Sequence, residues 1–515
     1  MLKILWADDE IELLKPHILF LKAKGYDVIP VTDGRSALET LDKDEPDIIF
    51  LDEQMPGLSG LDVLGKIKTK YPSIPVVMIT KSEEESIMEQ AIGSKISDYL
   101  IKPVNPNQIL LVLKKHLIGN ELIKDTTVTN YQQEFREIGL KLNERLGWNE
   151  WIEVYRKLVY WELELSSAKD SSFHEILKQQ KEEANRQFCK FYESNYEDWL
   201  QDRAAEKPPL SHTVLREKLF PLFESDRPTF LLVIDNLRFD QWKAIQSQIT
   251  PLLRVKSEEM YYSILPTTTQ YARNALFSGL MPSEIQKKYP KYWVNEDQEG
   301  NKNDFEPQLM DEYLRRFGIN IKQSYYKVLN LSFGWHVVDL LPNLMGNKLN
   351  IIIYNFVDML SHARTSSDLV RELAEDEKAY RAVTATWIEH SPLLEIIEFL
   401  SEKNVNVVIT TDHGSVRVSK PVKIKGDKEL STNLRYKVGR LVDYNPKQVF
   451  STRDAEKLFL PKLNLISPYI FAHENDFFAY PNNYNYYVNY YSNTFQHGGI
   501  SMEEILVPFI TLESK

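Results

Sequence analysis

The stretch "NIIIYNFVDMLSHA", residues 350–363, joins a short apolar run to an aspartate and, four residues later, a histidine. Two other apolar runs lead into acids in the same way, "TFLLVIDNLRFD" at 229–240 and "NVVITTDHGS" at 406–415. Short apolar runs that stop at polar residues are typical of buried strands in a parallel sheet. Each acid alone could cap a helix or bind a loop, but the C-terminal ends of parallel strands meet at one edge of the sheet, where α/β folds bind ligands.

The composition limits the class of protein. A chain of 515 residues predicts two or three domains, and 43% hydrophobic with 26% charged residues is ordinary for a soluble globular protein. A formal net charge of −12 argues against general binding to long nucleic acid. Cys189 is the only cysteine, which excludes an internal disulfide and any cysteine-based zinc finger. The start "MLKILWADDE" lacks a signal-peptide pattern and no apolar run reaches about 18 residues, so we expect a cytoplasmic protein without a transmembrane segment.

The chain divides into three segments, which together predict an α/β protein. Residues 1–118 alternate apolar strands with amphipathic helices, the rhythm of a doubly wound parallel sheet. Residues 119–215 are predicted to form a packed helical connector, because glycines are few and apolar residues recur at spacings of three and four. Strands and helices alternate again over 216–515, which predicts a second α/β domain. Within it, the run "YNYYVNYYSN" at 484–493 favours an exposed loop or edge strand, and base stacking is the weaker alternative.

Five polar side chains follow or end the strands of the first segment. They are Asp8, Asp9, Asp52, Thr80 and Lys102. Clustered carboxylates repel one another unless a hard cation lies between them, and Mg²⁺ with oxygen ligands suits such a cluster. A carboxylate beside Mg²⁺ and a lysine can act as a nucleophile towards a phosphoryl group.

The motifs "ADDE", "LDEQMPGLSGLD", "VVMIT" and "DYLIKP" resemble those of the receiver domain of two-component response regulators, over essentially all of residues 1–118. The resemblance implies a flavodoxin-like fold that a sensor histidine kinase phosphorylates. It assigns the phospho-acceptor to Asp52, the acidic magnesium pocket to Asp8 and Asp9 with Asp52, the switch hydroxyl to Thr80, the switch aromatic to Tyr99 and the phosphate-facing cation to Lys102.

The acid-tipped strands of the third segment predict a second site. The run "TFQHGGI" adds a further histidine, and its two glycines would let the backbone pass close to a ligand. Oxygen and nitrogen ligands without sulfur suit one or two Zn²⁺ or Mn²⁺ ions. The candidate ligands are Asp235, Asp358, His362, Asp412, His413 and His497.

A nucleophile candidate lies in "ILPTTTQYARNALFSGL", where three threonines precede an amphipathic helix. The threonines could simply cap that helix. Alternatively, the helix N-terminus attracts an anion, and a metal lowers the pKa of a threonine hydroxyl. Arg273 in this stretch could pair with a phosphate oxygen, face solvent or hold the fold.

The motifs "LLVIDNLRFDQW", "LPTTTQYARNALFSG", "FVDMLSH", "TTDHGS" and "QHGG" are similar, in order, to those of the PglZ branch of the alkaline phosphatase superfamily, over about 216–515. The resemblance implies two zinc ions. One is bound by Asp235, Thr269, Asp412 and His413, and the other by Asp358, His362 and His497. It also implies that Thr269, the second threonine of the Pro-Thr-x-Thr pattern, is the catalytic nucleophile rather than Thr267 or Thr268.

The three segments together resemble PorX-like response regulators, which are linked to the type IX secretion system. The resemblance implies a phosphorylation-controlled, zinc-dependent phosphohydrolase, which we expect to be a nucleotide or oligonucleotide phosphodiesterase, and a homodimer that forms on phosphorylation. The alternative is a signalling adaptor whose metal domain binds a sigma factor or a secretion-motor protein. No convincing helix-turn-helix motif is visible, which argues against direct promoter binding.

Overall fold

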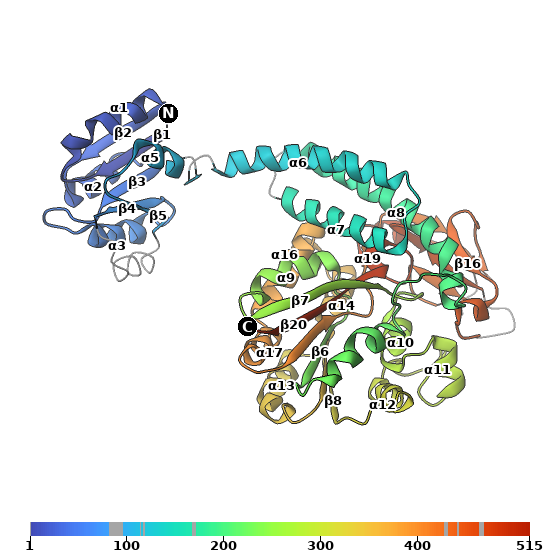
Figure 1. Cartoon of the computed structure of the whole chain (residues 1–515). Coiled ribbons are helices and arrows are strands. Elements are labelled where there is room, and N and C mark those ends of the chain that lie inside the picture. Colours follow the sequence, from blue (N-terminus) through green and yellow to red (C-terminus); the bar gives the residue numbers. More distant parts are fainter. Residues whose placement is uncertain are drawn as a thin grey trace. The chain divides into compact units, whose positions relative to one another are not determined.

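The computed structural model describes residues 2–81, 96–113, 115–116, 119–166, 171–426, 431–439, 442–462 and 468–515. The chain forms two compact units, Met1–Gln132 and Gln133–Lys515 (Figure 1). Among the described residues, no helix is both long enough and apolar enough to cross a bilayer.

The first unit is the predicted doubly wound parallel sheet. Its strand order is β2 (Tyr26–Val31), β1 (Leu2–Ala7), β3 (Ile48–Asp52), β4 (Val76–Thr80) and β5 (Asp98–Ile101). All four pairings are parallel, so every strand ends at the same edge. The connecting helices are α1 (Lys15–Ala23), α2 (Gly34–Leu41), α3 (Gly60–Lys70) and α5 (Pro106–Leu113).

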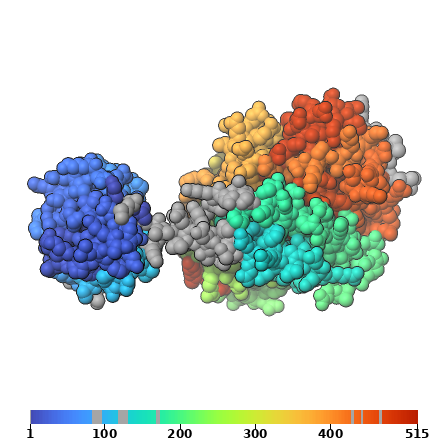
Figure 2. Space-filling model, turned by 90° about the horizontal axis from the view of Figure 1, so that it is seen from above, coloured from blue at the N-terminus to red at the C-terminus, as the bar shows by residue number. Residues whose placement is uncertain are grey.

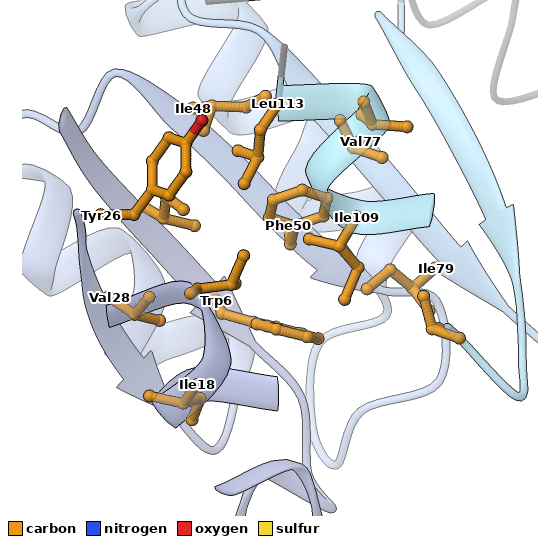
Figure 3. Packing of buried hydrophobic residues seen from close by; sticks show 14 of the residues in the cluster. Trp6, Ile18, Tyr26, Val28, Ile48, Phe50, Val77, Ile79, Ile109 and Leu113 are labelled. Atoms are coloured by element: carbon orange, nitrogen blue, oxygen red, sulfur yellow. The ribbon is translucent and has the colours of Figure 1, made fainter. Parts of the chain in front are cut away.

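Successive residues of the first unit's strands point to opposite faces, and each face is covered by its own apolar cluster. On one face, Trp6 and Phe50 pack with Ile109 and Leu113 of α5 (Figure 3). On the other, Leu5 and its neighbours pack against α2 and α3. Because both faces are buried, these strands read as continuous apolar runs in the sequence.

The segment predicted to be helical contains α6 (Gly119–Leu142), α7 (Trp148–Leu165) and α8 (Ser171–Leu200). From residue 133 onwards these helices belong to the second unit, where they lie on its surface (Figure 2). Tyr192 of α8 stacks on Tyr262 of β7 (Leu253–Tyr262), and Asn185 of α8 donates a hydrogen bond to Glu503. Helix α8 is therefore packed against the sheet of the second unit. The boundaries at 118 and 215 stay a prediction.

The second unit is built on a six-stranded mixed sheet. Its order is β7, β20 (Leu506–Ser514), β10 (Asn406–Thr410), β6 (Thr229–Ile234), β9 (Leu349–Tyr354) and β8 (Gln323–Val328). The four strands from β10 to β8 are parallel, whereas β20 runs antiparallel to both of its neighbours. Besides α7 and α8, its longer helices are α9 (Phe239–Ile249), α12 (Glu306–Arg316), α13 (Leu331–Leu344), α14 (Phe356–Ser366), α16 (Glu377–Glu389) and α17 (Pro392–Ser401). Shorter ones are α10 (Asn274–Ser278), α11 (Pro282–Lys288), α15 (Asp368–Leu373) and α19 (Met502–Ile505).

Small strands between β10 and β20 form a subdomain. They are β11 (Val416–Arg417), β12 (Lys420–Lys423), β13 (Lys425–Gly426), β14 (Tyr436–Val438), β15 (Val442–Asp443), β16 (Val449–Thr452), β17 (Tyr469–Ala472), β18 (Asp476–Ala479) and β19 (Phe495–Gln496). The tyrosine-rich run, predicted to be an exposed loop or edge strand, has no fully buried residue but forms the helix α18 (Tyr484–Tyr491). That prediction is wrong because Tyr484, Val488 and Tyr491 have helical spacing and pack together on a buried apolar cluster of this subdomain.

Candidate metal and phosphoryl-transfer sites

The acidic pocket of the first unit forms where β1, β3 and β5 end. Lys102 Nζ lies 2.9 Å from a carboxylate oxygen of Asp8 and 2.9 Å from one of Asp52. Oxygen atoms of Asp8, Asp9 and Asp52 all lie within 4.8 Å of one another, and Asp9 is exposed. A set of carboxylate oxygens that is open to solvent on one side fits Mg²⁺, which keeps several of its waters.

Burial controls the charge of this pocket. It raises the pKa of Asp52 to about 6, although the hydrogen bond from Lys102 opposes the shift, and the charge of Asp8 adds to it. Burial also disfavours the charged form of Lys102, but hydrogen bonds to both aspartates outweigh this effect and raise the pKa of the lysine. Three acids beside one lysine leave an excess of negative charge that a divalent cation would neutralise.

The predicted switch residues lie nearby. Thr80 ends β4, is buried, and donates a hydrogen bond to the carboxylate of Glu53. Tyr99 on β5 is 41% exposed. A Cβ atom on Gly60 would lie 2.3 Å from the Asp52 carbonyl oxygen, so α3 can begin this close to the acceptor strand only with glycine. The sequence prediction missed Glu53 and Gly60, although both belong to the "LDEQMPGLSGLD" motif.

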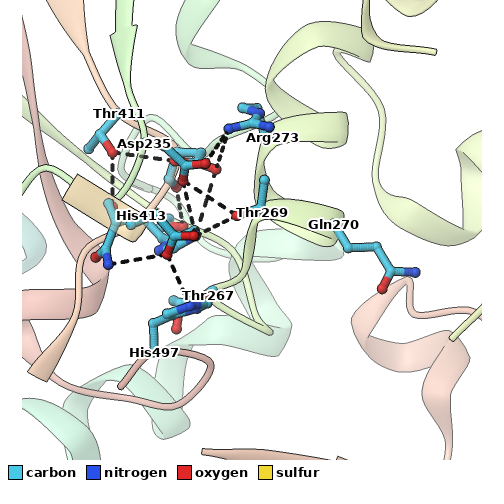
Figure 4. Close-up of polar contacts among 12 residues, drawn as sticks. Asp235, Thr267, Thr269, Gln270, Arg273, Thr411, His413 and His497 are labelled. Atoms are coloured by element: carbon cyan, nitrogen blue, oxygen red, sulfur yellow. Dashed lines mark hydrogen bonds and ion pairs between the residues drawn. The ribbon is translucent and has the colours of Figure 1, made fainter. Parts of the chain in front are cut away.

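In the second unit, Thr269 meets residues from two strand ends (Figure 4). Its Oγ1 lies 3.1 Å from Nε2 of His413, just beyond β10, and 3.4 Å from Oδ1 of Asp235, directly after β6. His413 Nε2 lies 3.7 Å from Asp235 Oδ1 and 3.7 Å from Asp412 Oδ2. Ligand atoms of these three predicted residues lie within 4.8 Å of one another. Gln270, by contrast, points away from the cluster.

Asp358, His362 and His497 form a second cluster. Asp358 is in the first turn of α14 and His362 is one turn later, so both project from a helix rather than from the strand tip predicted for them. The Asp358 carboxylate lies 3.4 Å from Nε2 of His362 and 3.4 Å from Nε2 of His497. The rings of His413 and His497 stack with centroids 4.3 Å apart, which places the two clusters side by side.

The tautomers of His413 and His497 indicate whether the two clusters can bind a metal. Nδ1 of His413 lies 3.1 Å from the Gly414 carbonyl oxygen, and Nδ1 of His497 lies 3.2 Å from the Thr267 carbonyl oxygen. A carbonyl oxygen only accepts hydrogen bonds, so Nδ1 carries a hydrogen and, in a neutral ring, the lone pair of Nε2 faces the carboxylates. Lone pairs that face carboxylate oxygens repel them unless a cation lies between. The donor set therefore fits Zn²⁺ or Mn²⁺.

Burial and neighbouring charges shift the pKa values in both clusters. Burial, reinforced by the charge of Asp235, raises the pKa of Asp412 to about 6, and burial lowers the pKa of His413 to about 4. Burial also raises the pKa of Asp235, although Arg273 opposes it. At Asp358 hydrogen bonds with His362 and His497 outweigh burial and hold the pKa well below its usual range. The Asp358 carboxylate correspondingly outweighs burial at His497 and raises the pKa of that imidazole.

The three threonines have different surroundings. Thr267 Oγ1 donates to the Gly499 carbonyl oxygen at 3.0 Å and accepts from the Gly498 amide at 2.9 Å, so it fixes the loop that carries His497. Thr268 Oγ1 is buried without a hydrogen-bond partner among the described residues. Thr269, which begins a helical turn (Thr269–Arg273), is the one whose hydroxyl contacts predicted metal ligands.

Arg273 holds the fold of the site. Its buried guanidinium donates to Asp235 Oδ2 at 2.6 Å through Nη1 and to Glu306 Oε1 at 2.7 Å through Nε. This favours the structural alternative for Arg273. Glu306 was missed because nothing in the sequence links it to an arginine 33 residues away.

The two glycines after His497 were predicted to let the backbone pass close to a ligand. In the structure they instead let it pass close to other parts of the protein. A Cβ on Gly498, whose φ is +123°, would lie 2.8 Å from Asn433 Oδ1, and one on Gly499 would lie 2.5 Å from the Ala472 carbonyl oxygen. The loop therefore needs glycine at both positions to pack against the small-strand subdomain.

A third cluster of carboxylates in the second unit is already neutralised by arginines. Glu162, Asp240 and Glu377 also lie close enough to share an ion. Arg238 and Arg381, however, already lie 2.7 Å and 3.0 Å from Asp240 Oδ2. Guanidinium groups neutralise these acids, so the cluster is an ion network that joins α7, α9 and α16.

A cavity of 720 Å³ opens over the two clusters. Asp235, Thr269, Asp358, His362 and His497 line it, and polar side chains such as Lys302 and Lys327 form part of its wall. The volume is in the range of small-molecule and nucleotide sites.

Comparison with known protein families gives three matches along the chain. Residues 4–114 match the response regulator receiver domain, residues 121–200 the PorX response regulator linker domain, and residues 214–512 the BREX system PglZ alkaline phosphatase-like domain. Receiver and alkaline phosphatase-like domains generally bind divalent metals.

Two curated relatives each match less than a quarter of the chain. The alkaline phosphatase synthesis transcriptional regulatory protein PhoP of Bacillus subtilis (strain 168) is 32% identical over 122 residues, 23% of this chain and 50% of its own length. The regulatory protein VanR of Enterococcus faecium is 37% identical over 117 residues, 22% of this chain and 49% of its own. The chain thus spans about half the length of these relatives.

Among solved structures, the chemotaxis protein CheY4 of Vibrio cholerae is 28% identical over 23% of this chain and 99% of its own, with a TM-score of 0.22. The PglZ match alone covers more than half of the 515 residues. The chain therefore belongs to the family of proteins with a PglZ alkaline phosphatase-like domain, joined here to a response regulator receiver domain and a PorX linker domain.

Proposed function

We propose that the chain is a two-component response regulator in which phosphorylation of Asp52 controls a zinc-dependent phosphodiesterase that acts on nucleotides or oligonucleotides. The observation that carries the proposal is the position of Thr269, whose hydroxyl contacts His413 and Asp235 at the base of a nucleotide-sized cavity. A sensor histidine kinase would phosphorylate Asp52 with Mg²⁺ held by Asp8, Asp9 and Asp52. The modified protein would form a homodimer in the cytoplasm.

The ligand sets follow the two clusters. We assign one zinc to Asp235, Thr269, Asp412 and His413, and the other to Asp358, His362 and His497. Bound zinc supplies a Lewis acid, which polarises a phosphoryl oxygen and lowers the pKa of a hydroxyl group.

The chain's own residues supply the rest of the chemistry. The Thr269 hydroxyl loses its proton as its oxygen attacks the phosphorus of the diester in line. The bond to the leaving oxygen breaks, the leaving group departs as an alcohol with that proton, and the remaining phosphate ester is bonded to Thr269. Water then attacks the phosphorus in a second in-line step, gives one proton to the departing Thr269 oxygen and releases the phosphomonoester. Arg273, held by Glu306, keeps Asp235 in place throughout, and the Gly414 carbonyl keeps Nε2 of His413 directed at the site.

Hydrolysis of bis(p-nitrophenyl) phosphate by the purified full-length protein tests the proposal. We expect activity that a chelator removes and added zinc restores. Full activity in metal-free protein would contradict both zinc assignments. A protein with zinc bound but no hydrolysis would favour an adaptor that binds a sigma factor or a type IX secretion protein.

A further inference from the structure

A second cavity, also of 720 Å³, lies beside the catalytic cavity and shares three lining residues with it, Thr432, Leu434 and Tyr491. The shared lining residues make the two cavities neighbouring compartments. A ligand with its phosphorus at Thr269 that extended past these residues would enter the second compartment.

The wall of this second cavity is aromatic. Tyr480 follows β18, and Tyr487 and Tyr491 are one turn apart on α18. The rings of Tyr487 and Tyr491 are nearly parallel, with centroids 6.1 Å apart and an angle of 11° between their planes. Tyr491 is held by the apolar cluster beneath α18, whereas 37% of Tyr487 is exposed. The helix thus presents ordered ring surface to the cavity without burying it against the protein.

One cation belongs to the same compartment. Lys437 on β14 lines the cavity, is 1% exposed, and has its Nζ 5.2 Å from the centre of the Tyr480 ring. Its ammonium donates to the Ser431 carbonyl oxygen at 2.5 Å. An ammonium group has three hydrogens, so Lys437 can also bind an acceptor on a ligand. Burial lowers the pKa of this lysine to about 8, partly opposed by Glu296.

We propose that this second cavity is a subsite that takes a planar aromatic group of the phosphodiester, such as a nucleobase, while the phosphate lies at Thr269. Tyrosine rings provide stacking surface for any planar ring, and Lys437 provides a donor for an oxygen on its edge. The inference rests on the proposed function and adds the place where the planar ring of the substrate would bind.

Two substrates with the same leaving group test the subsite. The p-nitrophenyl ester of thymidine 5′-monophosphate carries a base, and methyl p-nitrophenyl phosphate does not. We expect the wild type to prefer the thymidine ester in kcat/KM. Tyr487→Ala should lower that preference about tenfold, mainly through KM, because loss of one stacked ring weakens binding by roughly this factor. Tyr487→Phe, which keeps the ring, should retain the preference.

Tyr486→Ala is the matched control, since Tyr486 is on the same helix, 64% exposed, and lines neither cavity. It should leave the preference unchanged. If bis(p-nitrophenyl) phosphate shares the advantage of the thymidine ester, the subsite accepts aromatic rings in general; if not, it is selective for a base. An equal preference in wild type and Tyr487→Ala would overturn the subsite while leaving the phosphodiesterase intact.

If the wild type hydrolyses none of these esters, the proposed function fails and binding decides the subsite separately. Equilibrium dialysis of thymidine 5′-monophosphate with the zinc-loaded protein should then show about tenfold weaker binding to Tyr487→Ala than to Tyr486→Ala. Equal affinities would refute the subsite.

Discussion

The two acidic sites share a position in the fold and differ in their side chains. In both units, aspartates lie at the C-terminal ends of parallel strands. In the first, oxygen ligands lie beside Lys102, with Asp9 open to solvent. In the second, imidazoles accompany buried aspartates and a buried arginine anchors one of them. Sheet topology therefore sets where each site lies, and the donor atoms of the side chains decide its chemistry. We propose that the first site forms a transient acyl phosphate and that the second hydrolyses a phosphodiester.

The aspartates themselves do not account for the difference between the two sites. Burial raises the pKa of Asp52 and of Asp412 to about 6 in both units. What differs is the neighbouring group, a lysine in the first site and a histidine in the second. A lysine can neutralise the oxygens of an incoming phosphoryl group, whereas a neutral imidazole binds zinc.

The largest effect is expected at the nucleophile. Thr269→Ala should lower phosphodiester hydrolysis by at least about a hundredfold while zinc stays bound, because the six Asp and His ligands remain but no neighbouring oxygen replaces the attacking one. Steady-state rates together with elemental analysis measure this. Thr268→Ala is the matched control and should be near normal, because its hydroxyl has no partner among the described residues. Wild-type rates in Thr269→Ala would rule out covalent catalysis by this residue.

The next largest effect is expected in the zinc content of variants in the two units. We expect about two zinc ions per chain, and Asp358→Ala or His497→Ala should remove about one of them, since each belongs to a single cluster. Asp52→Ala in the first unit should leave zinc unchanged. Inductively coupled plasma mass spectrometry gives the stoichiometry, and loss of zinc in Asp52→Ala would mean that the two sites are not independent.

Occupation of the Asp52 pocket is expected to double the mass of the protein particle in solution. Beryllofluoride with Mg²⁺ should occupy the Asp52 site and convert monomer to dimer, as a phosphoryl group there would reposition Thr80 and Tyr99. Light scattering reports the mass, with Asp52→Ala as the unresponsive control. Equal masses for both proteins, with and without beryllofluoride, would leave the switch without support.

The smallest effect concerns pH. The folded-state pKa of Asp52 is raised, so its favourable contribution to stability is present below about pH 4 and is lost as pH rises through about 6. In metal-free protein, Asp52→Asn should therefore stabilise the first unit by about 1–3 kcal/mol more at pH 7 than at pH 4.5.

Hydrogen exchange at the amides of β1 measures this difference within the first unit. The counterpart Asp412→Asn, followed at β10, should show the same sign, since burial has the same effect there. A stability gain in Asp52→Asn that is independent of pH would contradict the raised pKa.

The sequence was enough to predict the buried parallel strands and the grouping of the acids, but not the antiparallel strand β20 that makes the second sheet mixed. Apolar runs such as 229–234 and 406–410 must be buried, and parallel strands bring Asp235 and Asp412 to one edge whatever lies between them. The family motifs then divided six residues into two ligand sets, and the same two clusters are found in the structure. The metals themselves and the roles of these residues remain proposals.

The contacts between segments that are distant in sequence depend on the tertiary structure. Thr269 contacts His413, which is 144 positions away in the sequence, whereas Thr267 contacts the loop that carries His497. Three identical threonines in a row give no sign of this difference. Arg273 holds Asp235 rather than facing solvent because Glu306 approaches it from another helix. Local periodicity fixes which residues a strand or helix buries, whereas the partners of a buried polar group depend on how separate elements pack.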